Sequence, residues 1–175
     1  MKLIITLIIL SFFIETFGQN KKSYLQLGPI GYLKNNNTLI GGCIGSGSIK
    51  GTSGLGFGVE VLTQKDNGIF IPIYFDARVY FKKTGSRPFA LFQPGFIIRN
   101  KTITISNIQS KNTGGIYLAG GVGFISMASK VGMTFQLKYS MVSTKTTIAK
   151  TNPYNKVSQS TNNPGFLCLF FGIAI

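Results

Sequence analysis

Apolar and polar residues alternate one by one over a stretch in the middle of the chain. From Ile69 to Phe81 every second side chain is apolar, and the positions between them hold Phe70, Pro72, Tyr74, Asp76, Arg78 and Tyr80. Successive side chains of a β-strand point to opposite faces, so this stretch predicts a strand with two different faces. Its length is sufficient for a strand that crosses a bilayer, which needs ~9–11 residues.

Seven other stretches alternate in the same way, some of them blurred by glycines. The eight predicted strands are 23–33, 38–49, 53–64, 69–82, 88–99, 114–126, 130–142 and 165–175. Helical periodicity is absent after the N-terminal segment. The pattern therefore predicts an all-β fold, an eight-stranded antiparallel up-and-down transmembrane β-barrel.

The connections between these strands differ in length. Three are short, at 50–52, 83–87 and 127–129, and the others are 34–37, 65–68, 100–113 and 143–164. Outer-membrane barrels combine short periplasmic turns with longer external loops. With a periplasmic N-terminus, the second group is expected outside, and 100–113 and 143–164 are predicted to be long polar loops.

Alternation alone leaves open which face points inward. A soluble lipocalin-like barrel encloses a ligand with its apolar face, whereas a membrane barrel turns that face to lipid. Only 13% of the residues are charged, and Glu60, Asp66 and Asp76 are the only carboxylates beyond the N-terminal segment, whereas soluble surfaces carry about 25–35% charged residues. The apolar face is therefore expected outside. Aromatic residues near the strand ends fit the interfacial belts of such barrels, although some are simply strand formers; they are Tyr24, Tyr32, Phe81, Phe89 and Tyr139.

Residues 1–18 are predicted to be a signal peptide that precedes a single barrel domain, 19–175. A lysine precedes the mostly apolar run Leu3–Ile14, and the small residues Thr16 and Gly18 suit a cleavage site. The apolar run is shorter than the ~20 residues of a membrane-spanning helix. Export and cleavage near Gly18 predict the bacterial outer membrane as the location.

Charged side chains on the inward face are expected to pair with one another. They are Glu60, Asp76, Arg78, Arg99 and Lys138. An isolated buried charge costs several kcal/mol, so the two carboxylates are expected to accept from the three cations. Such a network could gate a conduction path or simply fill the lumen, and an eight-stranded barrel, whose interior side chains can fill, favours the second.

The formal net charge of +14 raises the question of an anionic partner. Basic residues in the predicted loops include Lys101, Lys111, Lys145, Lys150 and Lys156. No basic helix or RNA-binding aromatic motif accompanies them, so nucleic acid is not an expected partner. Anionic lipid and lipopolysaccharide phosphates fit a basic surface better.

Signatures of catalysis are missing from the sequence. The chain has no histidine, which excludes histidine-based triads and histidine metal sites. Its few carboxylates are too scattered for paired-carboxylate hydrolysis. We therefore expect no enzyme activity, no cofactor and no metal. Cys43 and Cys168, on the second and last predicted strands, would be separated by the first strand, too far apart for a disulfide, so both are expected to be free.

Three stretches carry a resemblance to a known family. The chain resembles the small outer-membrane β-barrel proteins of Gram-negative bacteria, which are called the porin-family or OmpA/OmpX-like group. The central hairpin of the Bacteroidetes-type members of this group is similar to two stretches, Ile71-Pro-Ile-Tyr-Phe-Asp-Ala-Arg-Val-Tyr-Phe81 and Arg87–Phe96. Gly114–Phe124 is similar to their sixth strand. The chain ends in Ile175, whereas that group commonly ends in an aromatic residue. The resemblance implies fold and location but no defined activity.

Three functions stay open at this level. The first is a structural or surface-interaction role of a monomeric barrel with a filled lumen, whose basic loops 100–113 and 143–164 meet lipopolysaccharide or an extracellular partner. The second is a narrow porin-like channel for small solutes. The third is a soluble exported lipocalin-like barrel that binds a ligand.

Overall fold

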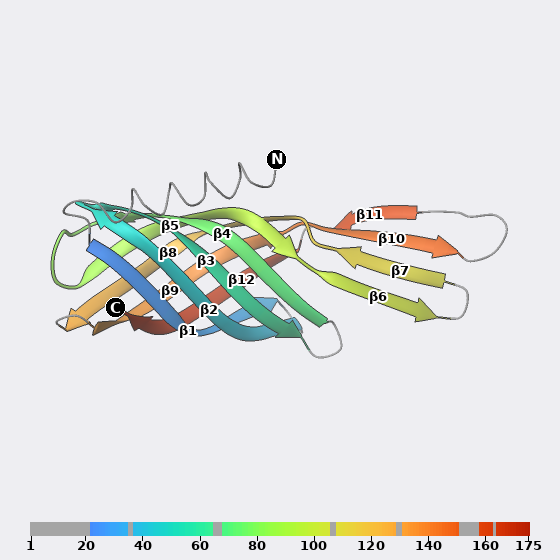
Figure 1. The fold of residues 1–175 in the computed structure, drawn as a ribbon, viewed down its shortest axis with the longest axis horizontal. Helices are drawn as coiled ribbons and strands as arrows, with labels where there is room; N and C mark the ends of the chain where they lie inside the picture. The colour runs from blue at the N-terminus through green and yellow to red at the C-terminus, as the bar shows by residue number, and fades with distance from the viewer. Residues whose placement is uncertain are drawn as a thin grey trace, which may run out of the picture.

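The computed structural model describes residues 22–34, 37–64, 68–105, 108–128, 131–150, 158–162 and 164–175, which form twelve β-strands (Figure 1). Eight of them are long: β1 (Lys22–Lys34), β2 (Asn37–Lys50), β3 (Ser53–Gln64), β4 (Gly68–Tyr80), β5 (Arg87–Ile98), β8 (Ile116–Ala128), β9 (Val131–Val142) and β12 (Gly165–Ala174). Four are shorter: β6 (Asn100–Ile105), β7 (Ile108–Thr113), β10 (Thr144–Lys150) and β11 (Ser158–Asn162). Among these described residues, no helix is long and apolar enough to cross a membrane.

The eight longer strands close into a barrel in the order β1-β12-β9-β8-β5-β4-β3-β2. All neighbouring pairs are antiparallel, and β1 closes the ring against β12, from Gln26 opposite Ala174 to Leu33 opposite Leu167. Closure pairs the backbone groups of both strand edges, as a hydrocarbon environment requires. The predicted eight-stranded antiparallel barrel is confirmed, and each strand begins and ends close to its predicted position.

Side chains alternate between the interior and the outer surface along the barrel strands. On β9 exposed and buried positions alternate without interruption, and on β4 Tyr74 is 2% exposed whereas Phe75 is 60% exposed. Large apolar side chains point outward on every barrel strand. An exterior of this kind suits a lipid environment and not water. The predicted outward orientation of the apolar face is confirmed.

The prediction of aromatic belts was wrong for three of its five residues. Phe81 and Tyr139 are exposed, but Tyr24, Tyr32 and Phe89 are buried inside the barrel. Each of these three residues lies at one of the alternate positions of β1 or β5 that point into the barrel. Nearness to a strand end says nothing about which face a side chain occupies.

Glycines on neighbouring strands make room for inward aromatic rings. Gly58 on β3 lies opposite Tyr74 on β4, and Gly123 on β8 lies opposite Phe89 on β5. A Cβ atom on Gly58 would be 2.5 Å from the Tyr74 ring, and one on Gly123 would be 2.4 Å from the Phe89 ring. The many glycines of the polar face are therefore part of the interior packing.

The described residues of 100–113 and most of those of 143–164 form strands, which corrects the prediction of long polar loops. β6 and β7 extend the hairpin of β5 and β8, and β10 and β11 extend that of β9 and β12. The two extensions pair through β7 and β10 into a four-stranded sheet of order β11-β10-β7-β6, which leads away from one end of the barrel (Figure 1). Each hairpin alone would be marginal, and pairing with its neighbour stabilises both. Residues 106–107, 151–157 and 163 lie outside the described residues.

The two ends of the barrel are therefore different. The sheet extends from one end, and the other end carries the beginning of β1, the end of β12 and the turns at 51–52 and 81–86. Gly51 and Gly85 adopt φ values of 63° and 69° there. Glycine adopts this left-handed conformation without steric cost, which explains its place in these turns.

Candidate functional site

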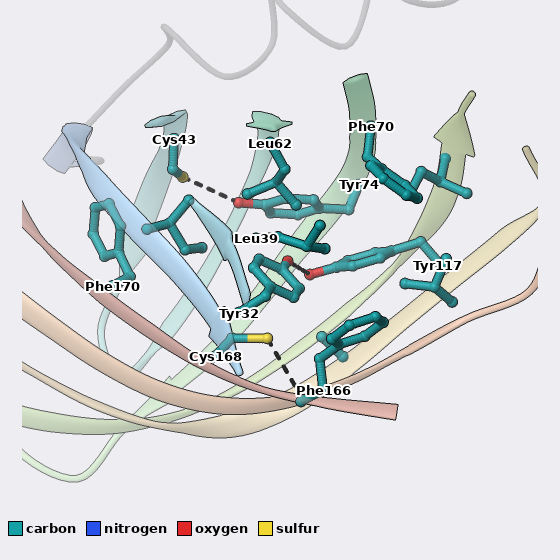
Figure 2. Close-up of a cluster of buried hydrophobic side chains, with 14 residues drawn as sticks. Tyr32, Leu39, Cys43, Leu62, Phe70, Tyr74, Tyr117, Phe166, Cys168 and Phe170 are labelled. Carbon is teal, nitrogen blue, oxygen red and sulfur yellow. Dashed lines mark hydrogen bonds between the residues drawn. The ribbon is translucent and has the colours of Figure 1, made fainter. Parts of the chain in front are cut away.

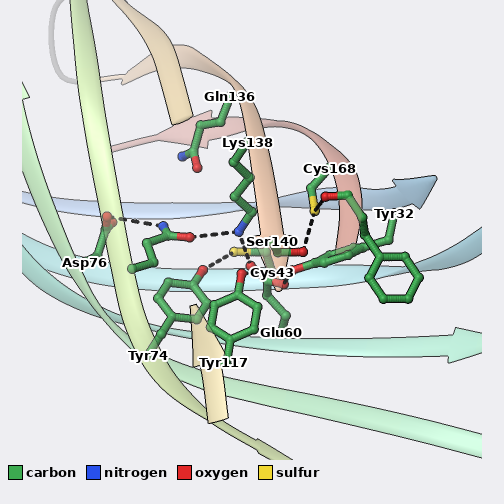
Figure 3. A network of polar contacts seen from close by, with 12 residues as sticks. Tyr32, Cys43, Glu60, Tyr74, Asp76, Tyr117, Gln136, Lys138, Ser140 and Cys168 are labelled. Atoms are coloured by element: carbon green, nitrogen blue, oxygen red, sulfur yellow. Dashed lines mark hydrogen bonds and ion pairs between the residues drawn. The ribbon is translucent and has the colours of Figure 1, made fainter. Parts of the chain in front are cut away.

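The candidate site is a network of polar side chains inside the barrel. Ionisable and amide side chains from β1, β3, β4, β5 and β9 are buried there, although none of the strands is polar throughout. Figure 3 shows Asp76, Glu60 and Lys138 pointing into the space enclosed by the ribbons. Alternation on each strand places these side chains inward because the intervening positions are apolar and face outward.

Asp76 and Arg78 form the first ion pair, toward the end of the barrel opposite the sheet. They lie two positions apart on β4 and so share its inward face. Arg78 Nε donates to Asp76 Oδ2 at 2.9 Å, and Arg78 Nη2 donates to Gln26 Oε1 at 2.7 Å. The guanidinium carbon lies 4.6 Å from the ring centre of Tyr24 and 4.8 Å from that of Phe89. A carboxylate, an amide and two aromatic faces thus stabilise the buried cation.

Glu60 and Lys138 form the second ion pair, which crosses the barrel. They lie on β3 and β9, which are four strands apart in either direction around the ring. Lys138 Nζ is 2.5 Å from Glu60 Oε1, and the other oxygen of Glu60 accepts a hydrogen bond from the Tyr32 hydroxyl. Both charged side chains are fully buried. Opposite walls of the lumen are therefore joined directly.

Gln93 on β5 connects the two ion pairs. Its Nε2 donates to Asp76 Oδ1 at 3.2 Å, and its Oε1 accepts from Lys138 Nζ at 2.9 Å. Gln136 on β9 extends the network by donating to Gln26 Oε1 at 2.9 Å. Two cations and two carboxylates balance within it, which lowers the cost of burying them.

Toward the sheet, the interior is filled by rings and aliphatic side chains (Figure 2). The rings of Tyr74 and Tyr117 stack with centroids 5.5 Å apart, and the hydroxyls of Tyr32 and Tyr117 are 3.0 Å apart. Phe166 packs edge-on against Tyr32 at 5.9 Å. These aromatic side chains continue the packing from the ion pairs toward the rim.

Both cysteines are free and buried. β1 lies between β2 and β12, so the strand that separates Cys43 from Cys168 is the one expected from the sequence. The Cys43 thiol lies 3.3 Å from the Tyr74 hydroxyl, and the Cys168 thiol lies 3.0 Å from the Ser140 hydroxyl. The two thiols belong to the packed interior.

The structure brings together four of the five charged residues expected inside. Glu60, Asp76, Arg78 and Lys138 form the two ion pairs. Arg99 follows the last residue of β5, and its guanidinium carbon lies 4.2 Å from the ring centre of Phe70. It therefore sits at the rim on the side of the sheet, away from Asp76.

Four of the five basic residues expected in loops lie on the sheet instead. Lys101 is on β6, Lys111 on β7, and both Lys145 and Lys150 on β10. The Lys145 side chain is exposed. Lys156 lies outside the described residues.

Sequence reasoning missed the neutral members of the network. Gln26, Gln93 and Gln136 are all buried and make hydrogen bonds to charged groups or to one another. The sequence did contain a signal for their burial, because each glutamine lies at one of the alternate positions of its strand that point into the barrel. Their role as connectors could not be predicted, because it depends on which strands face each other across the lumen. Among the described residues, no group of three or more Cys, Asp or Glu side chains lies close enough to hold a metal ion.

Comparisons with known proteins bear on the fold alone. No protein-family model and no curated protein matches the sequence. Among solved structures, the chain is similar to the crystal structure of a major outer membrane protein from Thermus thermophilus, with a TM-score of 0.50 and 12% sequence identity. The match covers 87% of this chain and 98% of that one. The chain therefore has the fold of an outer-membrane β-barrel.

Proposed function

We propose that this protein resides in the outer membrane of a Gram-negative bacterium as a monomeric barrel, with a structural or surface-interaction role. The apolar exterior of a closed barrel supports insertion into lipid. The predicted signal peptide, residues 1–18, would direct export. The similarity to an outer membrane protein of Thermus agrees with this location. Short turns at one end of the barrel and a sheet at the other favour an outward-facing sheet.

The packed interior supports a structural role over conduction. The Glu60–Lys138 pair spans the lumen, and aromatic side chains fill the space toward the sheet. A solute path would have to separate at least this pair, leaving two buried charges without partners at a cost of several kcal/mol. The soluble lipocalin-like alternative is disfavoured because large apolar side chains line the outside of the barrel.

The four-stranded sheet is the observation that carries the surface-interaction role. Its parent segments, 100–113 and 143–164, contain five lysines and no carboxylate: Lys101, Lys111, Lys145, Lys150 and Lys156. Pairing of β7 with β10 joins β6, β7, β10 and β11 into one platform that is tied to the barrel by four strand connections. A rigid cationic platform beside the membrane suits anionic partners, foremost the phosphates of lipopolysaccharide.

Binding to lipopolysaccharide by barrel protein embedded in nanodiscs of zwitterionic lipid tests this role. Replacing the five lysines by glutamine should abolish most of the binding, and binding by the wild-type protein should weaken as salt screens the charges. A matched control replaces Lys22, Lys50 and Lys82, which lie at the other end of the barrel. Equal binding by the five-lysine variant and the control variant would show that the sheet is not the binding surface.

A further inference from the structure

A cavity of about 210 Å³ lies at the end of the barrel opposite the sheet. Inward-facing residues near the strand ends line it, among them Tyr24, Ile49, Arg87 and Ile125. The turn between β4 and β5 borders it through residues 83–85. The cavity is thus the mouth of the barrel, and it lies away from both the sheet and the Glu60–Lys138 pair.

Two cationic side chains border this cavity, and no Asp or Glu side chain does. Lys83 is on the exposed turn, and Arg87, at the start of β5, is 8% exposed. Within the described ranges the ion pairs are the two of the inner network, so neither cation is paired with a carboxylate there. Arg87 is therefore a nearly buried cation without a carboxylate partner among the described residues, whereas water solvates the exposed Lys83.

Arg87 carries an unmet hydrogen-bonding requirement. Its guanidinium carbon lies 5.2 Å from the ring centre of Tyr80, and the buried Arg87 Nε and Tyr80 hydroxyl have no hydrogen-bond partner among the described protein atoms. A buried polar group without a partner is destabilising, and in native structures a water, ion or ligand usually satisfies it. Arg87 is thus a buried donor beside a cavity that also has an apolar wall.

We propose that the mouth cavity binds a small amphiphilic anion, a carboxylate carried on a compact hydrocarbon body. Arg87 pairs with the carboxylate and Lys83 adds a second positive charge, while Ile49, Ile125 and Met127 contact the hydrocarbon. A protein cavity of roughly 150 Å³ holds benzene, so about 210 Å³ accommodates a benzene-sized body with its carboxylate. A drug-sized ligand needs a larger pocket, of roughly 300–1,000 Å³.

The probes that separate charge from shape are benzoate, its neutral analogue benzamide, and acetate, which lacks the ring. Isotope-labelled protein is folded in an uncharged detergent, and the Met127 methyl and Gly85 amide resonances are followed during titration. Benzoate should shift both resonances saturably, whereas benzamide and acetate at the same concentrations should not. A detergent-only titration corrects for partitioning of the probe into micelles.

The matched variants are Arg87→Gln and Arg99→Gln. Both arginines lie over an aromatic ring at an end of β5, but Arg87 is the first residue of that strand, whereas Arg99 follows its last residue at the opposite rim, above Phe70. Arg87→Gln should weaken benzoate binding about tenfold or more, because it removes a charge-assisted hydrogen bond, and Arg99→Gln should not change it. If Arg87→Gln fails to fold, Lys83→Gln on the exposed turn takes its place and should weaken binding by a smaller factor. Absence of a saturable shift, binding of benzamide as strong as that of benzoate, or unchanged binding in the substituted protein would overturn the proposal.

Discussion

Replacing Lys138 by methionine is expected to lower the free energy of unfolding by about 3–5 kcal/mol. Methionine preserves most of the aliphatic stem but removes the ammonium group, which lies 2.5 Å from Glu60 Oε1 and 2.9 Å from Gln93 Oε1. Glu60 then keeps only the hydrogen bond from the Tyr32 hydroxyl. The Glu60 side chain is 0% exposed, so bulk water does not reach the carboxylate through the intact barrel.

The expected loss comes from the unpaired charge and not from a change in packing. The double variant Glu60→Gln/Lys138→Met removes both charges at nearly constant volume, and such replacements of a buried pair are often close to neutral. We therefore expect the double variant to be more stable than Lys138→Met alone. The coupling energy of the double-mutant cycle should be about 2 kcal/mol or more.

Urea unfolding of the protein in lipid vesicles measures these differences. The chain contains no tryptophan, so circular dichroism follows the transition, with heat-modifiable gel mobility as a second probe. Lys145→Met, at an exposed position of β10, is the control and should stay within about 0.5 kcal/mol of wild type. A loss below about 1 kcal/mol for Lys138→Met, or additive effects of the two substitutions, would refute the idea of a strictly buried ion pair.

Three further predictions address the outer face, the glycine packing and the lumen. Phe75→Arg, on the outward face, should cost about 2–4 kcal/mol of unfolding free energy in vesicles if the residue meets the middle of the bilayer, and an unchanged stability would contradict a lipid-facing position. Gly58→Ala should destabilise the same transition by about 1–3 kcal/mol because its Cβ would press on the Tyr74 ring, whereas Gly42→Ala, whose Cβ would meet no atom closer than 4.0 Å, should not. Asp76→Ala should lower stability yet leave planar bilayers without a steady single-channel current, and such a current through the wild-type protein would contradict a filled lumen.

The barrel strands could be predicted from the sequence because the constraint on them is local. A residue that faces lipid must be apolar whatever its distant neighbours are, so β4 and β9 reveal themselves by alternation alone. β6 and β10 belong to the four-stranded sheet and not to the barrel wall, so the constraint on the barrel strands does not act on them. Their Thr and Ile residues, as in Thr102–Ile105, favour strands, but the polar composition of the two segments predicts loops.

The sequence predicts most of the charged residues of the candidate site, but only some of the contacts between them. Asp76 and Arg78 could be placed together because they share one face of one strand. Glu60 and Lys138 meet only because closure of the ring puts β3 opposite β9, which local patterns do not encode. The contributions of Gln93 and Arg87 depend in the same way on what the closed barrel places beside them.

Labelling of single cysteines in intact cells tests the membrane orientation most directly. Ser160→Cys lies on β11 and Lys82→Cys on the turn at the other end, both at exposed positions, while the native Cys43 and Cys168 are buried and should stay silent. With a polymer-linked maleimide too large to cross the outer membrane, we expect Ser160→Cys to be labelled on intact cells and Lys82→Cys only after the membrane is permeabilised. Labelling in the reverse pattern, or recovery of the labelled protein in the soluble fraction without detergent, would contradict it.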